Sequence, residues 1–432
     1  MSFLEKTFKL GENKSSVKQE MMAGLTTFMT MSYILIVNPN ILSEAGMDKG
    51  AVFTATILAS FVACLAMGLI ANYPFALSAG MGLNAFFTYT VVLKMGHTWQ
   101  FALTAVFLEG IIFILMSLFK IREKIFDAIP YTLKKAVSVG IGLFISLIGF
   151  SSAGIIVNDQ GTILSLGNIK SNQSIVFFFG IILIAFLLIK KVKGAILFGI
   201  LGSTVLALIL GVTSFPTGIV STPPSMAETF FKFDFTNVFS LDMLIVLFTF
   251  LFVDIFDTLG TLIGVSTKAG MLNEKGELPR SGRALLADAI GTTVGATFGT
   301  STITTFVESA SGVADGGRTG LTAITTGFLF LVSLIFYPIF SIIPAAATGP
   351  ALVIVGLFMM SPILDIDFSD YTESIPAFLT IVMMPFAYSI AEGIVFGMIS
   401  FVIVKLIGKK SKEISPLMYI LAILFLVKII LS

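Results

Sequence analysis

Residues 68–84 read GLIANYPFALSAGMGLN, and residues 299–315 read GTSTITTFVESASGVAD. The two stretches align without a gap. The matched positions pair Gly68 with Gly299, Ser78 with Ser309, Ala79 with Ala310, and Asn84 with Asp315. Weaker matches follow in the same order, because Gly142-Leu-Phe resembles Gly356-Leu-Phe and residues 194–199 resemble residues 393–397. This shared order predicts a chain built from two related halves.

The composition around these stretches indicates a membrane protein. Hydrophobic residues make up 56% of the chain and charged residues only 12%, whereas soluble domains carry about 25% charged residues. The mean hydropathy is +1.01. Apolar runs long enough to span a bilayer lie near residues 22–42, 51–72, 74–92, 99–119, 131–153, 174–190, 193–211, 240–266, 283–299, 301–317, 319–342, 345–362, 374–389 and 391–408. Since lipid offers the backbone no hydrogen-bond partner, we predict an all-α polytopic membrane protein with about 14 transmembrane segments.

The repeat and the basic residues predict the topology. Seven spans per half is an odd number, so the first repeat (22–211) and the second (240–408) would be inverted relative to each other. Lys and Arg cluster in the N-terminal tail (1–21) and after spans four, six, eight and fourteen. By the positive-inside rule, we expect a cytoplasmic N-terminus in the cell (inner) membrane. The tail lacks the pattern of a signal peptide. A basic linker and a short apolar segment follow at 409–432, and whether 415–431 spans the membrane stays open.

Both aligned stretches should interrupt their helices. The first holds Tyr73-Pro74 and then the small-residue stretch 78–82, while residues 301–306 of the second are polar and β-branched. Pro and Gly weaken helix interiors. We therefore predict short strands in spans three and ten, each leading into a half-helix, and a substrate site between them. The alternative interpretation is close helix packing through small residues.

Acidic residues lie inside the predicted spans. Asp254 and Asp257 share one helical face of span eight, which Thr258 and Thr261 extend, and Glu308 begins the second half-helix. Two nearby carboxylates in a low dielectric do not both ionise at low cost, so one is a natural proton carrier and the other can accept a substrate N–H. We predict substrate or proton roles for Asp257 and Glu308, and proton coupling for Asp254. The alternative is a structural polar pair. Weaker candidates are Glu109, Asp288 and Glu392.

The aromatic residue Phe306 lies two positions before Glu308. An aromatic face beside a carboxylate suits a flat heteroaromatic ligand that carries ring N–H donors. Cys64 and His97 are the chain's single cysteine and single histidine, so we expect no metal site built from them and no internal disulfide. The net charge of +1 implies no nucleic-acid partner. No cofactor is predicted.

Four motifs resemble one family over essentially the whole chain, the adenine/guanine/hypoxanthine permeases of the xanthine/uracil permease (nucleobase–ascorbate transporter) superfamily. The motifs are AGLTTFMTMSYILIVNP (23–39), SAGMGLN (78–84), DIFDTLGT (254–261) and TFVES (305–309). The resemblance implies a core domain of 22–119 and 240–342 and a gate domain of 131–211 and 345–408. It also implies purine uptake coupled to protons, with the core moving against the gate, and in some relatives a homodimer.

The resemblance further implies that Asp257 and Glu308 hold the base and that Asn84 in span three contributes to the site. Uracil carriers have a histidine four residues after the acid of span eight, where this chain has Thr261, which argues against uracil. Our hypothesis adds packing by Phe306 and backbone N–H groups of Val307 and Ser309. Which purine is preferred stays open, and the choice of protons over sodium rests on the resemblance and the acids.

Two other classes of function are less well supported. An anion carrier for sulfate or bicarbonate on the same architecture would favour a fixed cation at the half-helix ends, but the broken segments hold no Lys or Arg. An intramembrane enzyme would need a nucleophile–base pair or a metal cluster. We therefore predict a transporter and not an enzyme.

Overall fold

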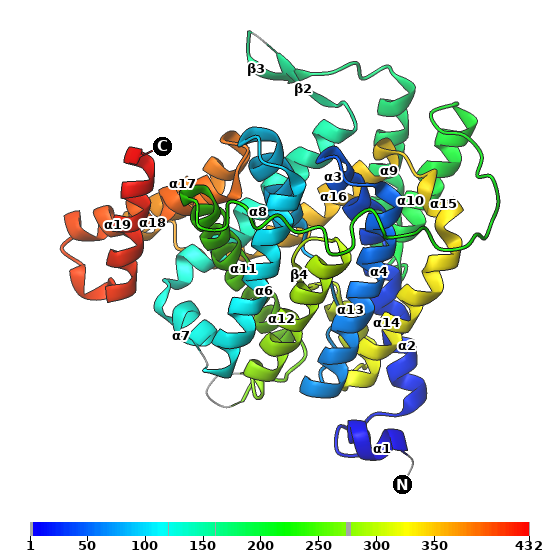
Figure 1. Cartoon of the computed structure of the whole chain (residues 1–432), viewed down its shortest axis with the longest axis horizontal. Coiled ribbons are helices and arrows are strands. Elements are labelled where there is room, and N and C mark those ends of the chain that lie inside the picture. The colour runs from blue at the N-terminus through cyan, green and yellow to red at the C-terminus, as the bar shows by residue number, and fades with distance from the viewer. Residues whose placement is uncertain (1–2, 120, 160, 274–277, 432) are drawn as a thin grey trace. The chain divides into compact units, whose positions relative to one another are not determined.

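Helices dominate the structure, as the apolar runs predict, and two short antiparallel sheets accompany them (Figure 1). The computed structural model describes residues 3–119, 121–159, 161–273 and 278–431. The chain divides into one unit of Met1–Phe119 and Gly149–Ala351, and a second of Lys120–Ile148 and Leu352–Ser432. The core and gate assignment made from the resemblance stays a prediction.

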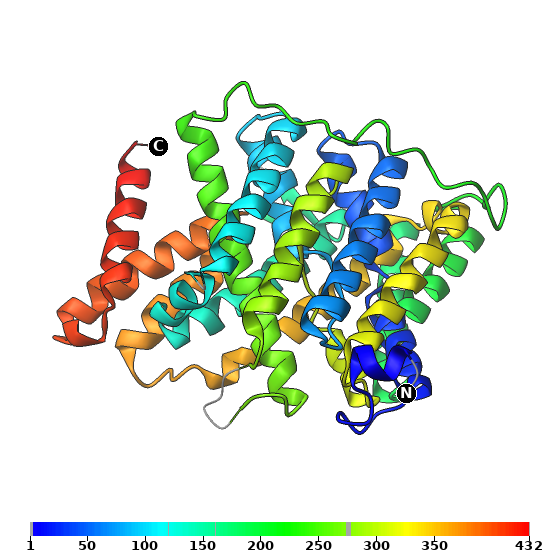
Figure 2. The same ribbon diagram turned by 60° about the horizontal axis from the view of Figure 1, so that its bottom comes forward.

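The helices of the first unit are α1 (Phe3–Phe8), α2 (Val17–Met31), α3 (Ile34–Glu44), α4 (Lys49–Ala66), the π-helix η1 (Met67–Ala71), α5 (Met81–Ala85), the π-helix η2 (Phe86–Lys94), α6 (Trp99–Leu118), α9 (Asn172–Ile189), α10 (Ala195–Ile209), α11 (Leu241–Lys268), α12 (Ser281–Phe298), α13 (Ser309–Ala314), α14 (Gly320–Ser333), the 3-10 helix η3 (Leu334–Phe336) and α15 (Tyr337–Ser341). Helix α12 packs against α6 and α4, and α14 packs against α2 and α4. The connection of residues 211–240 contains no regular helix or strand and runs as a long green trace along the top of Figure 2.

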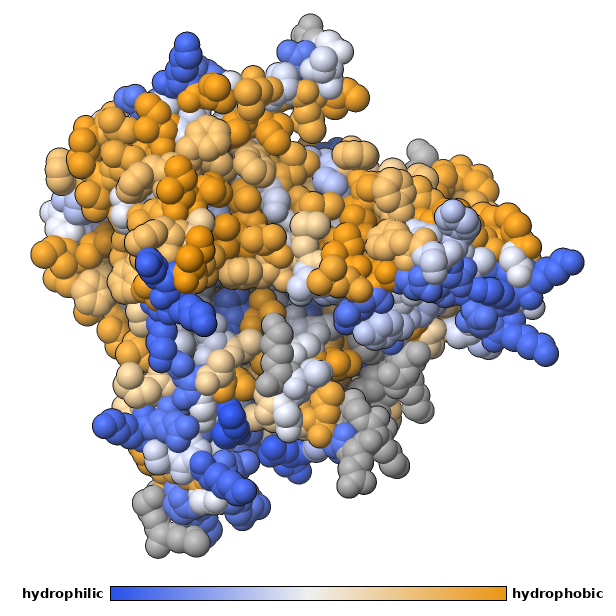
Figure 3. Space-filling model, turned by 180° about the vertical axis from the view of Figure 1, so that it is seen from behind, coloured by the Kyte–Doolittle hydropathy of each residue, from blue (hydrophilic) through white to orange (hydrophobic). Residues whose placement is uncertain are grey.

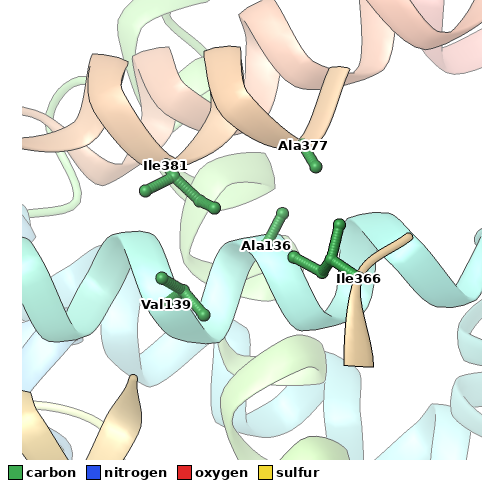
Figure 4. Close-up of a cluster of buried hydrophobic side chains, with 5 residues drawn as sticks. All are labelled: Ala136, Val139, Ile366, Ala377 and Ile381. Carbon is green, nitrogen blue, oxygen red and sulfur yellow. The ribbon is translucent and has the colours of Figure 1, made fainter. Parts of the chain in front are cut away.

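Helices α8 (Tyr131–Ser152) and α16 (Ala345–Met359) contribute residues to both units. The second unit also contains α7 (Ile121–Ala128), the 3-10 helix η4 (Ser361–Asp365), α17 (Tyr371–Phe386), α18 (Ile390–Ile407), the 3-10 helix η5 (Ser411–Glu413) and α19 (Pro416–Leu431). Its hydrophobic cluster joins α8 to α17 and the segment before α17 through Ala136, Val139, Ile366, Ala377 and Ile381 (Figure 4).

Ion pairs connect α17, α18 and η5 in the second unit. The Lys405 side chain is only 1% exposed and forms ion pairs with Glu373 and Glu413. Lys410 Nζ lies 2.6 Å from Asp370 Oδ2, and the hydrogen bond from this ammonium group holds the pKa of Asp370 well below its usual range. Because Asp370 also caps α17 through Thr372 N, these contacts fix the start of that helix.

Nine helices of the described residues are long and apolar enough to cross a membrane, so the chain is a multi-pass membrane protein. They are Val17–Glu44, Lys49–Ala71, Trp99–Ser117, Tyr131–Ser152, Asn172–Ile189, Leu241–Thr267, Gly320–Ser341, Ala345–Asp365 and Ile390–Ile407. Most of the face drawn in Figure 3 is correspondingly hydrophobic. The count of fourteen is not confirmed, because five of the predicted runs are not among these nine helices. Two of them, 74–92 and 301–317, contain breaks, two others form the shorter helices α10 and α17, and the fifth forms α12.

The predicted strands of spans three and ten are β1 (Leu77–Ala79) and β4 (Ile303–Thr305), and they pair antiparallel. Ser78 lies opposite Thr304, and the ladder continues at both ends through Gly80 N to Thr302 O (2.9 Å) and Phe306 N to Ala76 O (3.0 Å). Each strand leads into a helix, α5 after β1 and α13 after β4. Two segments with the same order and opposite direction are what inverted halves require, although the seven-span repeats stay a prediction.

Side chains of neighbouring helices satisfy the outer edges of this small sheet. Leu77 N donates to Cys64 Sγ (3.3 Å), and the Cys64 thiol donates to Leu77 O (3.5 Å). On the other edge, Ile303 N donates to Thr292 Oγ1 (3.2 Å), and that hydroxyl donates to Ile303 O (3.0 Å). Because lipid cannot satisfy open strand edges, Cys64 of α4 and Thr292 of α12 permit a sheet at this depth.

The gap-free alignment of the two stretches does not match these elements. It places β1 opposite residues 308–310, which begin α13, whereas β1 pairs with residues 303–305. Only Gly80 separates β1 from α5, but three residues, 306–308, separate β4 from α13. Asn84 and Asp315 also differ in role, since Asn84 accepts from Ser301 while Asp315 accepts from Lys193 Nζ (2.6 Å). The alignment therefore found the two segments that form the sheet, but it did not match strand with strand.

The sequence did not predict the second sheet, formed by β2 (Ile156–Asp159) and β3 (Ile163–Leu166). Asp159 Oδ1 accepts the backbone N–H of Gly161 (2.7 Å), and an aspartate that accepts from the backbone two residues ahead is typical of a turn. This turn signal was overlooked because it lies between two apolar runs that are long enough to be membrane spans.

Replacing Thr292 by Val tests the edge contacts of β4. The nearly isosteric Val leaves the N–H and C=O of Ile303 without this partner, so the free energy of unfolding should fall by about 1–3 kcal/mol. Thermal unfolding of the purified protein in detergent measures the loss. Thr292→Ser keeps the hydroxyl and should be close to wild type. Thr297→Val is the matched control, because its hydroxyl donates to Thr293 O of its own helix. Equal losses in Thr292→Val and Thr297→Val would contradict the assignment.

Candidate functional site

Three interruptions of the first unit meet at one place. Helix α2 ends at Met31 and α3 begins at Ile34, so Ser32 and Tyr33 form a two-residue break, with helical backbone angles, within the first span. The other two interruptions are Gly80, between β1 and α5, and residues 306–308, between β4 and α13. Backbone interrupted at membrane depth is tolerated only where protein surrounds it or a cavity adjoins it. The breaks after β1 and β4 lie where the sequence predicted a site, whereas the break at residues 32–33 was not predicted.

Glu308 is the residue that precedes α13, and only 7% of it is exposed. Its Oε1 accepts a hydrogen bond from the Tyr33 hydroxyl at 2.6 Å. Hydrogen bonds to an ionised group are shorter and stronger than neutral ones. The Phe306 ring lies 6.5 Å from the Tyr33 ring, between centroids, at 44°. The acid thus sits beside two aromatic rings, one predicted from the sequence and one not.

Asp257 of α11 lies on the side of Gly80 and β4. Its carboxylate hydrogen-bonds Thr304 of β4 and lies in electrostatic range of Glu308. A Cβ added at Gly80 would lie 2.9 Å from Thr304 Oγ1 and 3.4 Å from Asp257 Oδ2. Glycine at position 80 therefore leaves the space beside this carboxylate open, and the structure brings together the two acids given the main roles.

Asp254 belongs to a separate, completely buried group. Thr258 Oγ1 donates to Asp254 Oδ1 (2.8 Å) and contacts Asp288 Oδ1 of α12 (3.1 Å). None of the three side chains is exposed. Asp254 nevertheless acts electrostatically on Asp257. Of the weaker candidates, Asp288 belongs to this group, and Glu109 of α6 accepts from Thr302 Oγ1 at 2.6 Å, just before β4.

The remaining predicted residues differ in what they can offer a ligand. Asn84 is fully buried, and its Oδ1 accepts from Ser301. Its Nδ2 is a buried donor that has no hydrogen-bond partner in the described part of the chain. Ser309 is used internally, because its Oγ accepts from Ala76 N (3.0 Å) and its own N–H donates to Phe306 O (3.1 Å). Val307 is partly exposed.

Beyond Asp257, one face of α11 is open. Gly260, Thr261 and Gly264 follow Asp257 at helical spacing on that face. Gly260 and Gly264 are exposed, and a Cβ at either would meet no heavy atom within 4 Å. Asp257 and Thr261 are themselves partly exposed. The described part of the chain therefore leaves the face of α11 next to Asp257 uncovered.

The two carboxylates of the site offer hydrogen-bond acceptors to a ligand. Asp257 and Glu308 each hydrogen-bond a neutral hydroxyl, of Thr304 and Tyr33 respectively, and the segments 77–85 and 303–314 hold no Lys or Arg. Among the described residues, no three or more of His, Cys, Asp and Glu are grouped so as to hold a metal ion. A neutral or cationic ligand with N–H donors is therefore favoured over an anion.

Sequence reasoning missed the hydroxyl groups that hold the acids, above all Tyr33. The run 22–42 lies within one span, Val17–Glu44, as predicted, but no Pro or Gly marks the two-residue break at 32–33 inside it. The available signal was the unusually polar stretch Thr26–Tyr33 within an apolar run. Thr304 was noted only as part of a β-branched segment.

Comparisons with known proteins agree with the family resemblance seen in the sequence motifs. The xanthine/uracil permease family model, described as a permease family, matches residues 18–411. The guanine/hypoxanthine permease PbuG of Bacillus subtilis is 46% identical over 97% of this chain and 98% of its own length. The adenine permease AdeP of Escherichia coli is 43% identical over 99% of this chain and 96% of its own.

A solved structure supports the fold. The transmembrane domain of the cyanobacterial bicarbonate transporter BicA superposes with a TM-score of 0.64, covering 87% of this chain and 97% of that domain. The sequence identity is 16%, so this likeness concerns the fold alone.

The hydroxyl between Asp254 and Asp288 should be needed for stability. In Thr258→Val, Asp254 loses this donor and Asp288 loses this contact, so the free energy of unfolding should fall by about 1–3 kcal/mol. Denaturant titration of the purified protein measures the change, and Thr258→Ser should restore most of it. The control is Thr267→Val, which removes a hydroxyl that donates to Ile263 O on the same helix. A Thr258→Val protein as stable as this control would show that the contact does not matter.

Proposed function

Because the chain belongs to the xanthine/uracil permease family, we propose that it is a secondary active transporter that imports purine nucleobases across the cell membrane. The family match spans most of the chain, and relatives named as guanine/hypoxanthine and adenine permeases align over nearly their full length. The observation that carries the proposal is the proximity of Asp257 and Glu308, which lie within electrostatic range of each other where the helices are interrupted.

The chemistry of the two acids suits a purine. Hypoxanthine, guanine and adenine present ring or exocyclic N–H donors at the edge of a flat ring, and a carboxylate accepts such donors. In our proposal Asp257 and Glu308 accept them, and Phe306 packs against the ring. Asn84 adds the opposite polarity, because its Nδ2 can donate to a purine carbonyl or ring nitrogen. Thr261 lines the approach along α11.

Coupling to protons is the second part of the proposal. Both acids are held by neutral hydroxyls, so either carboxylate can take up a proton without breaking an ion pair. We assign the coupling proton to Asp257 or Glu308, with Asp254 influencing Asp257 through its charge. Movement of the core segments, 22–119 and 240–342, against the gate segments, 131–211 and 345–408, would carry the base across, as the resemblance implies.

An anion carrier is the alternative on the same architecture. The likeness to BicA does not favour it, since it reflects the fold alone. The broken segments hold two acids and no Lys or Arg, which is unfavourable for sulfate or bicarbonate.

Uptake of radiolabelled hypoxanthine, guanine and adenine into purine-transport-deficient cells tests the class. We expect uptake of at least one base, with loss of uptake when a protonophore collapses the proton gradient. Competition among the three bases then ranks the substrates. No uptake of any base, with the protein confirmed in the membrane, would refute the purine proposal. Uptake that ignores the protonophore but requires sodium would retain the substrate class and replace the coupling ion.

Substitution of the two acids tests the site. Asp257→Asn and Glu308→Gln should each weaken purine binding about tenfold or more, because a hydrogen bond to a charged group contributes about 1.5–3 kcal/mol. Equilibrium binding of labelled hypoxanthine to purified protein gives the affinity. Asp242→Asn is the control, since Asp242 lies in the first turn of the same helix and its side chain is 55% exposed. Wild-type affinity in both site variants would remove the roles assigned here.

A further inference from the structure

The contact between Tyr33 and Glu308 joins two segments far apart in the sequence. Tyr33 lies in the interruption of the first span, between α2 and α3, and is only 1% exposed. Its hydroxyl donates to one defined oxygen, Glu308 Oε1, at 2.6 Å. Since the Tyr33 ring also lies beside Phe306, it contacts both residues that the proposed function places against the base.

We propose that Tyr33 is a positioning residue that decides which oxygen of Glu308 meets the ligand. This inference rests on the proposed function. Glutamate has three rotatable side-chain bonds, and its two carboxylate oxygens are equivalent until something distinguishes them. Tyr33 fills an acceptor position on Oε1. Oε2 therefore becomes the oxygen that accepts the ligand N–H, held at one place beside Phe306.

The consequence is selectivity among bases. A carboxylate fixed by Tyr33 presents its acceptor at one point along the edge of the ring, so it favours ligands whose N–H falls at that point. Without the phenol oxygen, the carboxylate can turn to reach N–H groups placed elsewhere, at the entropic cost of ordering it anew for each ligand. Loss of the hydroxyl should therefore both weaken binding of the preferred base and reduce the difference between bases.

Tyr33→Phe tests the inference, because it removes one oxygen and keeps the ring. We expect the KM for the base that the wild type takes up best to rise about tenfold or more, with the maximal rate and the amount of protein in the membrane close to wild type. The affinity ratios among hypoxanthine, guanine and adenine, taken from competition, should move toward one. A residue needed only for folding would instead lower the amount of protein and leave KM and these ratios unchanged.

A double-mutant cycle identifies Glu308 as the partner. Binding of labelled hypoxanthine to purified protein is compared among wild type, Tyr33→Phe, Glu308→Gln and the double variant. If the hydroxyl acts through the carboxylate, Tyr33→Phe should change affinity less than twofold in the Glu308→Gln background. The control is Tyr89→Phe, whose hydroxyl also donates to a glutamate, Glu44 Oε1 at 3.2 Å, outside the site, and which should leave KM unchanged.

Two results would overturn the inference. One is a Tyr33→Phe protein with wild-type KM and wild-type base ratios. The other is a full multiplication of the two single effects in the double variant, which would mean that Tyr33 acts independently of Glu308. Should wild-type protein neither bind nor take up any purine, the proposed function fails instead, and that failure is seen before any variant is made.

Discussion

The structure depends on satisfying the backbone of two three-residue strands inside the membrane. A two-stranded sheet alone is at best marginally stable even in water, and in lipid its outer edges have no partner. Here Cys64 supplies one edge and Thr292 the other. With the outward groups of Leu77 and Ile303 satisfied, β1 and β4 can form inside the first unit, and a helix follows each strand. Gly80, Thr304 and Glu308 take their positions from that arrangement.

The two main acids are held in a way that suits exchange of protons and ligands. Each hydrogen-bonds a hydroxyl from a different segment, Tyr33 for Glu308 and Thr304 for Asp257. A buried ion pair would tie each carboxylate to its charged state, because breaking such a pair leaves an uncompensated charge. A hydroxyl can donate to a carboxylate and accept from a carboxylic acid. The site can therefore accommodate both protonation states with the same neighbours.

The features predicted correctly from the sequence are those that depend on residue composition and on the cost of burying charge. The resemblance to the purine permeases is confirmed, as are the multi-pass membrane character and the two strands at residues 77–79 and 303–305. The strands were predictable because Pro74, Gly80 and the β-branched run 301–305 disfavour helix, and the acids stood out because charge is rare in such segments. The roles of these residues and the homodimer stay predictions.

What sequence reasoning missed depends on three-dimensional pairing. Matching identical residues placed β1 opposite residues 308–310 and not opposite β4, five residues earlier, and the two additional linker residues at 306–308 account for only part of that shift. Tyr33 could not be found by helix-breaking residues, since no Pro or Gly marks its interruption. Cys64 and Thr292 look like ordinary small residues of a span until the strands they contact are known.

The burial of Cys64 has a practical consequence for measuring motion in this protein. Cys64 is the chain's one cysteine, it is fully buried, and its thiol is engaged by the backbone of β1. A cysteine introduced on the uncovered face of α11, for example at Gly264, would be the single thiol outside the protein interior. The natural chain therefore serves as its own background for attaching a fluorophore or spin label, so that distances could be followed during transport without first removing the native cysteine and disturbing the sheet.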